Sequence, residues 1–448
     1  MLQKGVEMKN RVNKVSDALN SFIRAESFSG IFLFFCAVSA MIVANSPLSH
    51  IYKEFWEQPF GFSFAGGFYG FSIHDWINDV LMSIFFLMVG LEIKRELLFG
   101  DLSGFQKAAF PVIGAIGGMI VPGVIYYALN MNTPSYHGFG IPMATDIAFA
   151  LGVILLLGKR VPLALKVFLV TLAVADDLGA IAVIAIFYPS PEGLHLSFLL
   201  AGVGIVGILG FMNYFGVRHL GVYIGIGILL WFCVHHGGIH ATIAAVILAF
   251  CIPVKPKIES KEFVEVVQQM ITIFESKDKE RKNILLDAEQ MSAINKAGQD
   301  FSKVQNPLLR LEHALQPLCA FIIMPLFAFA NAGVDVSAEV NFNIDNIMLG
   351  IMLGLVVGKP VGILGLTFLC EKFKIAARPE GVTWSHIFGA GMLAGIGFTM
   401  SMFVSNLAFD NVHSADVSKV AILLASSIAG ILGSLYLIIN HQISKAKS

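Results

Sequence analysis

The chain has 448 residues, of which 56% are hydrophobic and only 14% carry a formal charge. Soluble domains carry about 25% charged residues, so the composition excludes an ordinary soluble protein. The net charge of −1 provides no electrostatic footprint for nucleic acid, and we expect no nucleic-acid partner. The apolar residues form runs of roughly 20, the length of a helix that crosses a lipid bilayer. The composition therefore predicts an all-α polytopic membrane protein embedded in lipid.

The first 26 residues are polar and basic, and we expect them to form a cytoplasmic tail rather than a cleaved signal. Twelve apolar runs follow and predict twelve transmembrane spans. Spans 1–8 fill residues 27–253, spans 9–12 fill residues 314–441, and residues 442–448 form a second cytoplasmic tail. The runs lie near residues 27–46, 76–98, 107–128, 138–158, 163–187, 196–212, 219–235, 238–253, 314–333, 346–370, 386–408 and 417–441.

The basic residues support this count and orient the chain. With both termini in the cytoplasm, all but four of the 30 Lys and Arg residues fall in or beside inner segments. The exceptions are Lys53, Lys166, Lys359 and Lys419. Cytoplasmic loops are rich in Lys and Arg, and a miscounted helix would reverse the pattern downstream. We therefore expect both termini to lie inside the cell.

Residues 59–74, between the first two spans, have the pattern of a small outer β-hairpin. Aromatic residues alternate on both sides of a Gly-Gly pair in FGFSFAGGFYGFSI. Free strand edges outside the membrane can pair with a second chain, which would produce a homodimer. An interfacial loop with aromatic anchors is the alternative interpretation.

Residues 254–313 form a charged cytoplasmic linker between spans 8 and 9. The stretches KEFVEVVQQMITIF and NILLDAEQMSAI carry apolar residues at helical spacing. This pattern predicts amphipathic helices on the inner membrane surface. A regulatory or partner-binding role and a simple solvated linker both remain open.

Two spans contain signals that break a helix, one in each half of the chain. In span 4, GFGIPMATDIAFALGV, Pro142 removes a backbone donor just before Thr145 and Asp146. In span 11, FGAGMLAGIGFTMSMFV, four glycines weaken the helix around Thr399. Interrupted backbone survives in a bilayer only where it lines a cavity or binds something, as at the midplane site of a transporter. Close helix packing through small residues is the alternative explanation for the glycines.

Span 5, LALKVFLVTLAVADDLGAIAVIAIF, holds two adjacent carboxylates, Asp176 and Asp177. Neighbouring helical residues point about 100° apart, so one carboxylate can face a cation while the other faces Lys359 of span 10. Burial favours the neutral form of a carboxylate, and a nearby ammonium favours the charged form. Such a group can hold either a proton or a hard cation, which prefers oxygen ligands. The sequence therefore predicts competition between protons and a small cation at Asp176, Asp177, Asp146, Thr145 and Lys359.

Several motifs along the chain together resemble the NhaA-type sodium/proton antiporters. They are VGLEIKRELL, MATDIAFALGV, GKRVPLALKVFLVTLAVADDLGAI, LEHALQPL, MPLFAFANAG and GKPVGI. The resemblance implies inverted repeats in which spans 4 and 11 are broken and cross at mid-membrane. It implies a transporter without cofactors that exchanges external protons for internal sodium or lithium. The exchange would be electrogenic and regulated by pH, and the outer hairpin would be a dimer contact. The resemblance also implies the bacterial inner (plasma) membrane as the location.

The resemblance also implies roles for individual residues. Asp177 would be the principal ligand of the transported sodium or lithium and the proton carrier. Asp176 would engage either the cation or Lys359. Asp146, with Thr145 beside it, would balance the facing ends of the half-helices.

Sensing of pH would lie in the inner funnel, and an ordinary interfacial charge network is the alternative there. The candidates by motif position are Glu92, Arg95, Glu96, Glu312 and His313.

Other functions fit the sequence less well. An intramembrane aspartyl protease needs two aspartates that converge from separate helices, which adjacent residues cannot supply. A channel would need symmetric filter elements, which are not evident here. A potassium/proton exchanger, or another cation-coupled transporter of the same architecture, stays open because the sequence does not report the size of the cavity.

Overall fold

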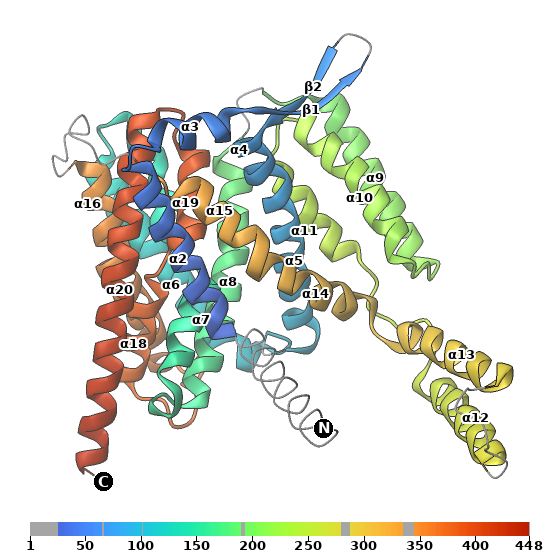
Figure 1. Cartoon of the computed structure of the whole chain (residues 1–448). Helices are drawn as coiled ribbons and strands as arrows, with labels where there is room; N and C mark the ends of the chain where they lie inside the picture. Colours follow the sequence, from blue (N-terminus) through green and yellow to red (C-terminus); the bar gives the residue numbers. More distant parts are fainter. Residues whose placement is uncertain are drawn as a thin grey trace, which may run out of the picture.

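The computed structural model describes residues 26–64, 67–100, 102–189, 193–278, 287–334 and 345–447, and almost all of them are helical (Figure 1). The predicted N-terminal tail lies outside these residues, apart from residue 26. Among the described residues, seven helices are long and apolar enough to cross a membrane, or ten if each bent pair counts as one span. The chain is therefore a multi-pass membrane protein, while twelve spans and inverted repeats stay predictions.

The continuous spans are uninterrupted helices, some with a π-helical turn inside them. They are α4 (Ile73–Asp75) with η1 (Trp76–Leu81) and α5 (Met82–Phe99), α6 (Phe105–Asn130), α8 (Leu163–Phe187), α9 (Leu196–Tyr214), α14 (Pro307–Leu318) with η4 (Cys319–Ile323) and α15 (Met324–Asn331), α16 (Asn346–Leu353) with η5 (Gly354–Gly358) and α17 (Lys359–Lys372), and α20 (Val412–Lys447). Two apolar helices are shorter, α10 (Leu220–His236) and α11 (Ala241–Cys251). All but α10 and α11 have the length that lets a helix satisfy its backbone hydrogen bonds across hydrocarbon.

Three pairs of helices are bent at a short break. The pairs are α2 (Glu26–Ala44) with α3 (Ser49–Glu57), η2 (Pro134–Met143) with α7 (Ile147–Leu156), and α18 (Trp384–Ala394) with α19 (Phe398–Ala408). The last two bend by 41° and 49° at the positions where the sequence predicts breaks. A single turn, η3 (Gly158–Arg160), follows α7.

The predicted hairpin is present. Strand β1 (Pro59–Phe64) pairs antiparallel with β2 (Gly67–Ser72), and Phe60 lies opposite Phe71. The second strand ends at Ser72 because its hydroxyl caps α4 by accepting a hydrogen bond from the N–H of Asp75. Figure 1 shows the hairpin at the end of the molecule opposite the end of α20. We call these two ends the hairpin side and the terminal side.

Helix α3 is an element that the sequence analysis did not predict. It turns back by 113° from α2 on the hairpin side. The helix is too short and too polar for its sequence to predict a transmembrane span. Tyr52 and Trp56 form its buried face, and both rings meet Phe329 of α15 edge-on, with ring centroids 5.7 and 6.1 Å apart. Helix α3 thus covers α15 on the hairpin side.

The charged linker contains two helices where it is described, as its apolar periodicity predicts. Helix α12 (Ser260–Asp278) packs against α13 (Ala288–Val304), with the rings of Phe263 and Phe301 4.8 Å apart. Residues 279–286 lie outside the described part. The next helix begins at Pro307, earlier than the predicted residue 314, because Asn306 caps it and proline suits the first helical position. At the other end of the chain, α20 runs on to Lys447, so the predicted tail is helical where it is described.

Candidate cation and proton site

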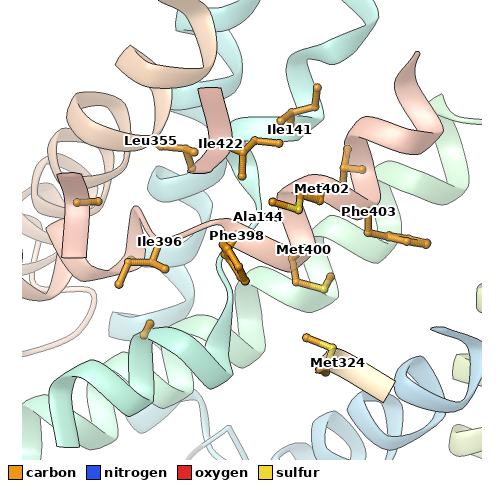
Figure 2. Packing of buried hydrophobic residues seen from close by; sticks show 14 of the residues in the cluster. Ile141, Ala144, Met324, Leu355, Ile396, Phe398, Met400, Met402, Phe403 and Ile422 are labelled. Atoms are coloured by element: carbon orange, nitrogen blue, oxygen red, sulfur yellow. The ribbon is translucent and has the colours of Figure 1, made fainter. Parts of the chain in front are cut away.

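The two broken spans meet at their breaks near the middle of the molecule. The N–H of Asp146, at the break between η2 and α7, donates to the carbonyl of Ile396, at the break between α18 and α19, at 2.8 Å. Figure 2 shows Ala144, Ile396 and Phe398 close together at this point, with Met400 and Met402 following along α19. The predicted crossing of interrupted helices is thus formed by residues 144–146 and 395–397.

Side chains satisfy the backbone groups that the breaks leave without helical partners. The hydroxyl of Ser401 donates to the carbonyl of Ile141 at 2.8 Å. The N–H of Phe398 donates to the hydroxyl of Ser426 at 3.1 Å. Buried backbone groups cost free energy when unpaired, so these bonds make the interruption tolerable.

Asp146 serves the N-termini of two half-helices at once. Its Oδ1 accepts from the N–H of Phe149 in α7 at 2.9 Å. Its Oδ2 accepts from the N–H of Thr399 at the start of α19 at 3.1 Å, and also from the Thr399 hydroxyl. The N-terminal end of a helix dipole attracts negative charge. The geometry therefore matches the balancing role that the resemblance implies for Asp146.

Lys359 lies at the start of α17, fully buried, and forms an ion pair with Oδ2 of Asp176. Its ammonium also donates to the Thr145 hydroxyl at 2.6 Å. That hydroxyl lies 2.6 Å from Oδ2 of Asp176 and 2.9 Å from the carbonyl of Ala394, the last residue of α18. A hydroxyl has one proton, so Thr145 can donate to only one of these two acceptors at a time.

Asp177 differs from its neighbour because the structure gives its carboxylate no counter-charge in contact. Its exposed fraction is 1%, and among the described residues its Oδ1 has no hydrogen-bond partner. The Oδ1 of Asp176 is also buried without a partner in the described part of the chain. A buried carboxylate oxygen without a partner is costly unless it binds a proton or a cation. These two oxygens are therefore the candidate positions for a proton or a small hard cation.

The structure groups most of the candidate pH-sensing residues around Arg95. The guanidinium contacts Glu96 at 2.9 Å and Glu312 at 2.9 Å, and Glu92 lies 3.9 Å away. The cluster joins α5 to α14. His313 is exposed, and in the described structure it makes no ion pair or hydrogen bond with the cluster.

The sequence analysis missed Lys94, which has a defined structural role. Its ammonium is buried and donates to the carbonyls of Phe250 and Ile252 at 2.7 and 2.5 Å, so it caps the end of α11. Its place in the KRE run made it resemble an ordinary interfacial lysine. The only available signal was its position, one residue before Arg95.

Comparison with known proteins yields one family. A family model described as Na+/H+ antiporter 1 matches residues 20–437. The chain is 85% identical over 441 residues to "Na(+)/H(+) antiporter NhaA 2" of Helicobacter hepaticus, covering 98% of this chain and 99% of that one. It is 61% identical to "Na(+)/H(+) antiporter NhaA" of Wolinella succinogenes, covering 96% and 94%.

A protein of Helicobacter pylori with the same name is 57% identical, covering 96% of this chain and 98% of that one. Among solved structures, the sodium proton antiporter MjNhaP1 of Methanocaldococcus jannaschii aligns with a TM-score of 0.47 and 11% identity. That alignment covers 93% and 98% of the two chains. Similarity at this level does not identify a function.

Proposed function

This chain belongs to the family of Na+/H+ antiporters, and on that premise we propose that sodium and protons compete for Asp176 and Asp177. The NhaA-type resemblance predicted from the motifs is confirmed by the family match and by the relatives named above. The protein is a secondary antiporter rather than an enzyme, which removes the protease interpretation. Its ions are transported substrates rather than cofactors.

The observation that carries the proposal is the pair of buried carboxylate oxygens without partners, beside an ion pair that can be opened. In the proton-loaded state, Asp177 is neutral and Asp176 is balanced by Lys359. A sodium or lithium ion that enters between the carboxylates takes the place of the proton on Asp177. It also competes with Lys359 and Thr145 for Asp176, because each of these groups neutralises the same oxygen.

Charge balance connects this arrangement to electrogenic exchange. If one proton leaves when one sodium ion binds, no net charge moves. An electrogenic cycle therefore needs a second proton, and we assign it to the Asp176–Lys359 pair, which loses its internal balance when the cation takes Asp176. If both termini lie in the cytoplasm, as we expect, the hairpin side faces the outside of the cell. Protons then enter the protein from the hairpin side, and sodium leaves through it. We assign pH regulation to the Arg95 cluster and dimer contact to the hairpin.

The test is proton flux in vesicles that contain the purified protein, on addition of sodium, lithium or potassium across a pH series. Asp177→Asn should reduce sodium- and lithium-driven flux at least 100-fold, because an amide can neither carry the proton nor supply a charged ligand. Asp410→Asn, at an exposed aspartate, is the matched control and should leave the flux near that of the parent.

The outcomes separate the alternatives. Unaltered flux in a folded Asp177→Asn variant would show that the aspartate pair is structural. Flux driven by potassium alone would keep the architecture and replace the substrate, which is the potassium/proton alternative.

A further inference from the structure

Four polar side chains join three spans on the hairpin side of the crossing. They are His74 of α4, Asn78 of η1, Asn331 at the end of α15 and Asn406 of α19, and we call them the asparagine network. Figure 1 shows α4, α15 and α19 on the hairpin side of the molecule. The network is separate from the aspartate site and from the Arg95 cluster.

Asn331 is the centre of the network. Its Oδ1 accepts from the amide of Asn406 at 2.6 Å and lies 3.2 Å from Nε2 of His74. Its own amide nitrogen donates to Oδ1 of Asn78 and to the carbonyl of Phe327, both at 3.0 Å. The residue is 1% exposed, and its amide uses both donor hydrogens and both acceptor positions. Asn331 therefore ties η1 and α19 to α15.

An aromatic layer lies between the network and the crossing. Phe327 and Phe403 are about one helical turn nearer the crossing than the asparagines of their own helices, and Phe86 is about two turns nearer than Asn78. The ring of Phe403 lies 5.1 Å from that of Phe86 and 6.4 Å from that of Phe327. All three rings are buried. Figure 2 shows Phe403 on α19 beyond Met400, on the far side from Phe398.

The order of residues along α19 stacks these features in series. Thr399 contacts Asp146 at the crossing, Phe403 belongs to the aromatic layer one turn further on, and Asn406 belongs to the network. Asp176 and Asp177 are 0% and 1% exposed, so nothing reaches them from the hairpin side as the structure stands. An ion that travels along α19 between the crossing and that side must pass both layers.

The contacts in the asparagine network allow α19 to separate from α15 and η1. Amide hydrogen bonds exchange for bonds to water at a small net cost, so water can replace them when the helices separate. Helix α19 has 11 residues and begins directly after the break at residues 395–397. It can tilt about that break and carry Phe403 and Asn406 with it while α18 stays in place.

We propose that the asparagine network and the aromatic layer are the gate on the hairpin side, and that Asn331 is the positioning residue that holds this gate shut. The gate opens once in each transport cycle to admit protons and release a hydrated monovalent cation. The proposal rests on the proposed function, because only a transporter must expose its site to both sides in turn.

The first test measures access to the site rather than transport. Ile181→Cys reports on a position one turn from Asp177, where the side chain lies beside Phe86 and Thr242. The five native cysteines are replaced, and a charged, membrane-impermeant methanethiosulfonate is added from the hairpin side. Asn331→Ala should raise the rate of modification at least fivefold. Asn406→Ala, which removes one bond of the network, should raise it less.

The matched control is Asn130→Ala. Asn130 is also a buried asparagine, and it joins α6 to α16 through the carbonyl of Asn346 at 3.0 Å, outside the proposed gate. Equal rates in the Asn331 and Asn130 variants would overturn the gate. This readout is the rate of cysteine modification and does not depend on flux. If Asn331→Ala speeds modification but the parent protein does not exchange sodium for protons, the proposed function is wrong while the gate is supported.

A second test asks whether opening is required for transport. Asn78→Cys and Asn331→Cys are bridged by a short bifunctional thiol reagent that reduction can cleave. The bridge should lower the rate of exchange at least tenfold, and reduction of the bridge should restore it. The same bridge between positions 130 and 346 should leave exchange unchanged. Full exchange with the 78–331 bridge in place would mean that the asparagine network stays closed throughout the cycle.

Discussion

Asp176 and Asp177 are neighbours in sequence, yet the structure gives them different chemistry. Side chains of adjacent helical residues diverge by about 100°, so only Asp176 meets Lys359 and Thr145. Asp177 is equally buried, and among the described residues no cationic side chain forms an ion pair with it. One carboxylate is therefore held in an ion pair, while Oδ1 of the other has no partner among the described residues. In the mechanism that we propose, this difference lets sodium and protons compete for Asp177.

At the residue scale, the Arg95 cluster predicts a change in pH dependence. Glu312→Gln removes one negative charge from a group in which Arg95 faces three carboxylates. A cluster with one negative charge fewer attracts protons less strongly. The pH of half-maximal exchange should therefore move toward acid by about half a unit or more. This sign holds whether loss of the proton switches exchange on or off.

The measurement is the pH profile of sodium-driven proton flux in vesicles. Glu265→Gln, at an exposed carboxylate of α12, is the control and should keep the parent midpoint. An unchanged midpoint in the Glu312 variant would assign the Arg95 cluster to joining α5 and α14 rather than to sensing pH.

At the scale of elements, the position of Lys359 depends on how closely two spans approach. A Cβ placed on Gly117 of α6 would lie 2.2 Å from the carbonyl oxygen of Gly362 in α17, and a Cβ on Gly362 would lie 2.1 Å from that of Gly117. Only glycine fits at both positions, which is how small residues let membrane helices pack backbone to backbone. This contact lies one turn from Lys359 and fixes the ammonium opposite Asp176.

Gly362→Ala should therefore destabilise the protein by roughly 1–3 kcal/mol, the usual cost of overpacking, and lower its exchange rate. Gly365→Ala is a matched control on the same helix, because a Cβ there meets nothing within 4 Å. Thermal unfolding in detergent, read by fluorescence, compares the two variants. If both melt at the temperature of the parent, α6 and α17 are free to move apart.

Much of the arrangement of elements could be predicted from the sequence, because a bilayer permits few backbone solutions. Runs of about 20 apolar residues must be helical to satisfy their backbone in hydrocarbon. Pro142 together with Gly138 and Gly140 favours a break. Pro111 and Pro122, in contrast, are accommodated inside the continuous helix α6. Other features depend on contacts between segments far apart in the chain. The choice of Asp176 as the partner of Lys359 follows from how α17 and α8 both pack against α6. The sequence alone indicates only that Asn331 ends a helix. Its contacts with Asn78 and Asn406 become evident only in the structure.

At the scale of the whole molecule, the hairpin projects from the helical spans (Figure 1), and its aromatic rings contact Trp76 of η1 and His235 of α10. It has two strands, and Phe60 on its surface is 63% exposed. An isolated two-stranded sheet is marginally stable, and its free edges can pair with a second copy. The two ends of the hairpin lie together, since the N–H of Ile73 donates to the carbonyl of Gln58 at 3.0 Å. The hairpin can thus be removed without moving the spans that it joins.

We therefore expect a variant in which a short Gly-Ser link replaces residues 60–71 to fold and to lose dimerisation. The parent should migrate as a dimer in mild detergent, and the variant should migrate as a monomer by light scattering coupled to size exclusion. Exchange per protomer should stay within about twofold of the parent, because the aspartates, Lys359 and the crossing lie within one chain and rest on contacts inside it. A variant that remains dimeric would place the contact between protomers on another surface, and the exposed rings of the hairpin would then be membrane-interface anchors.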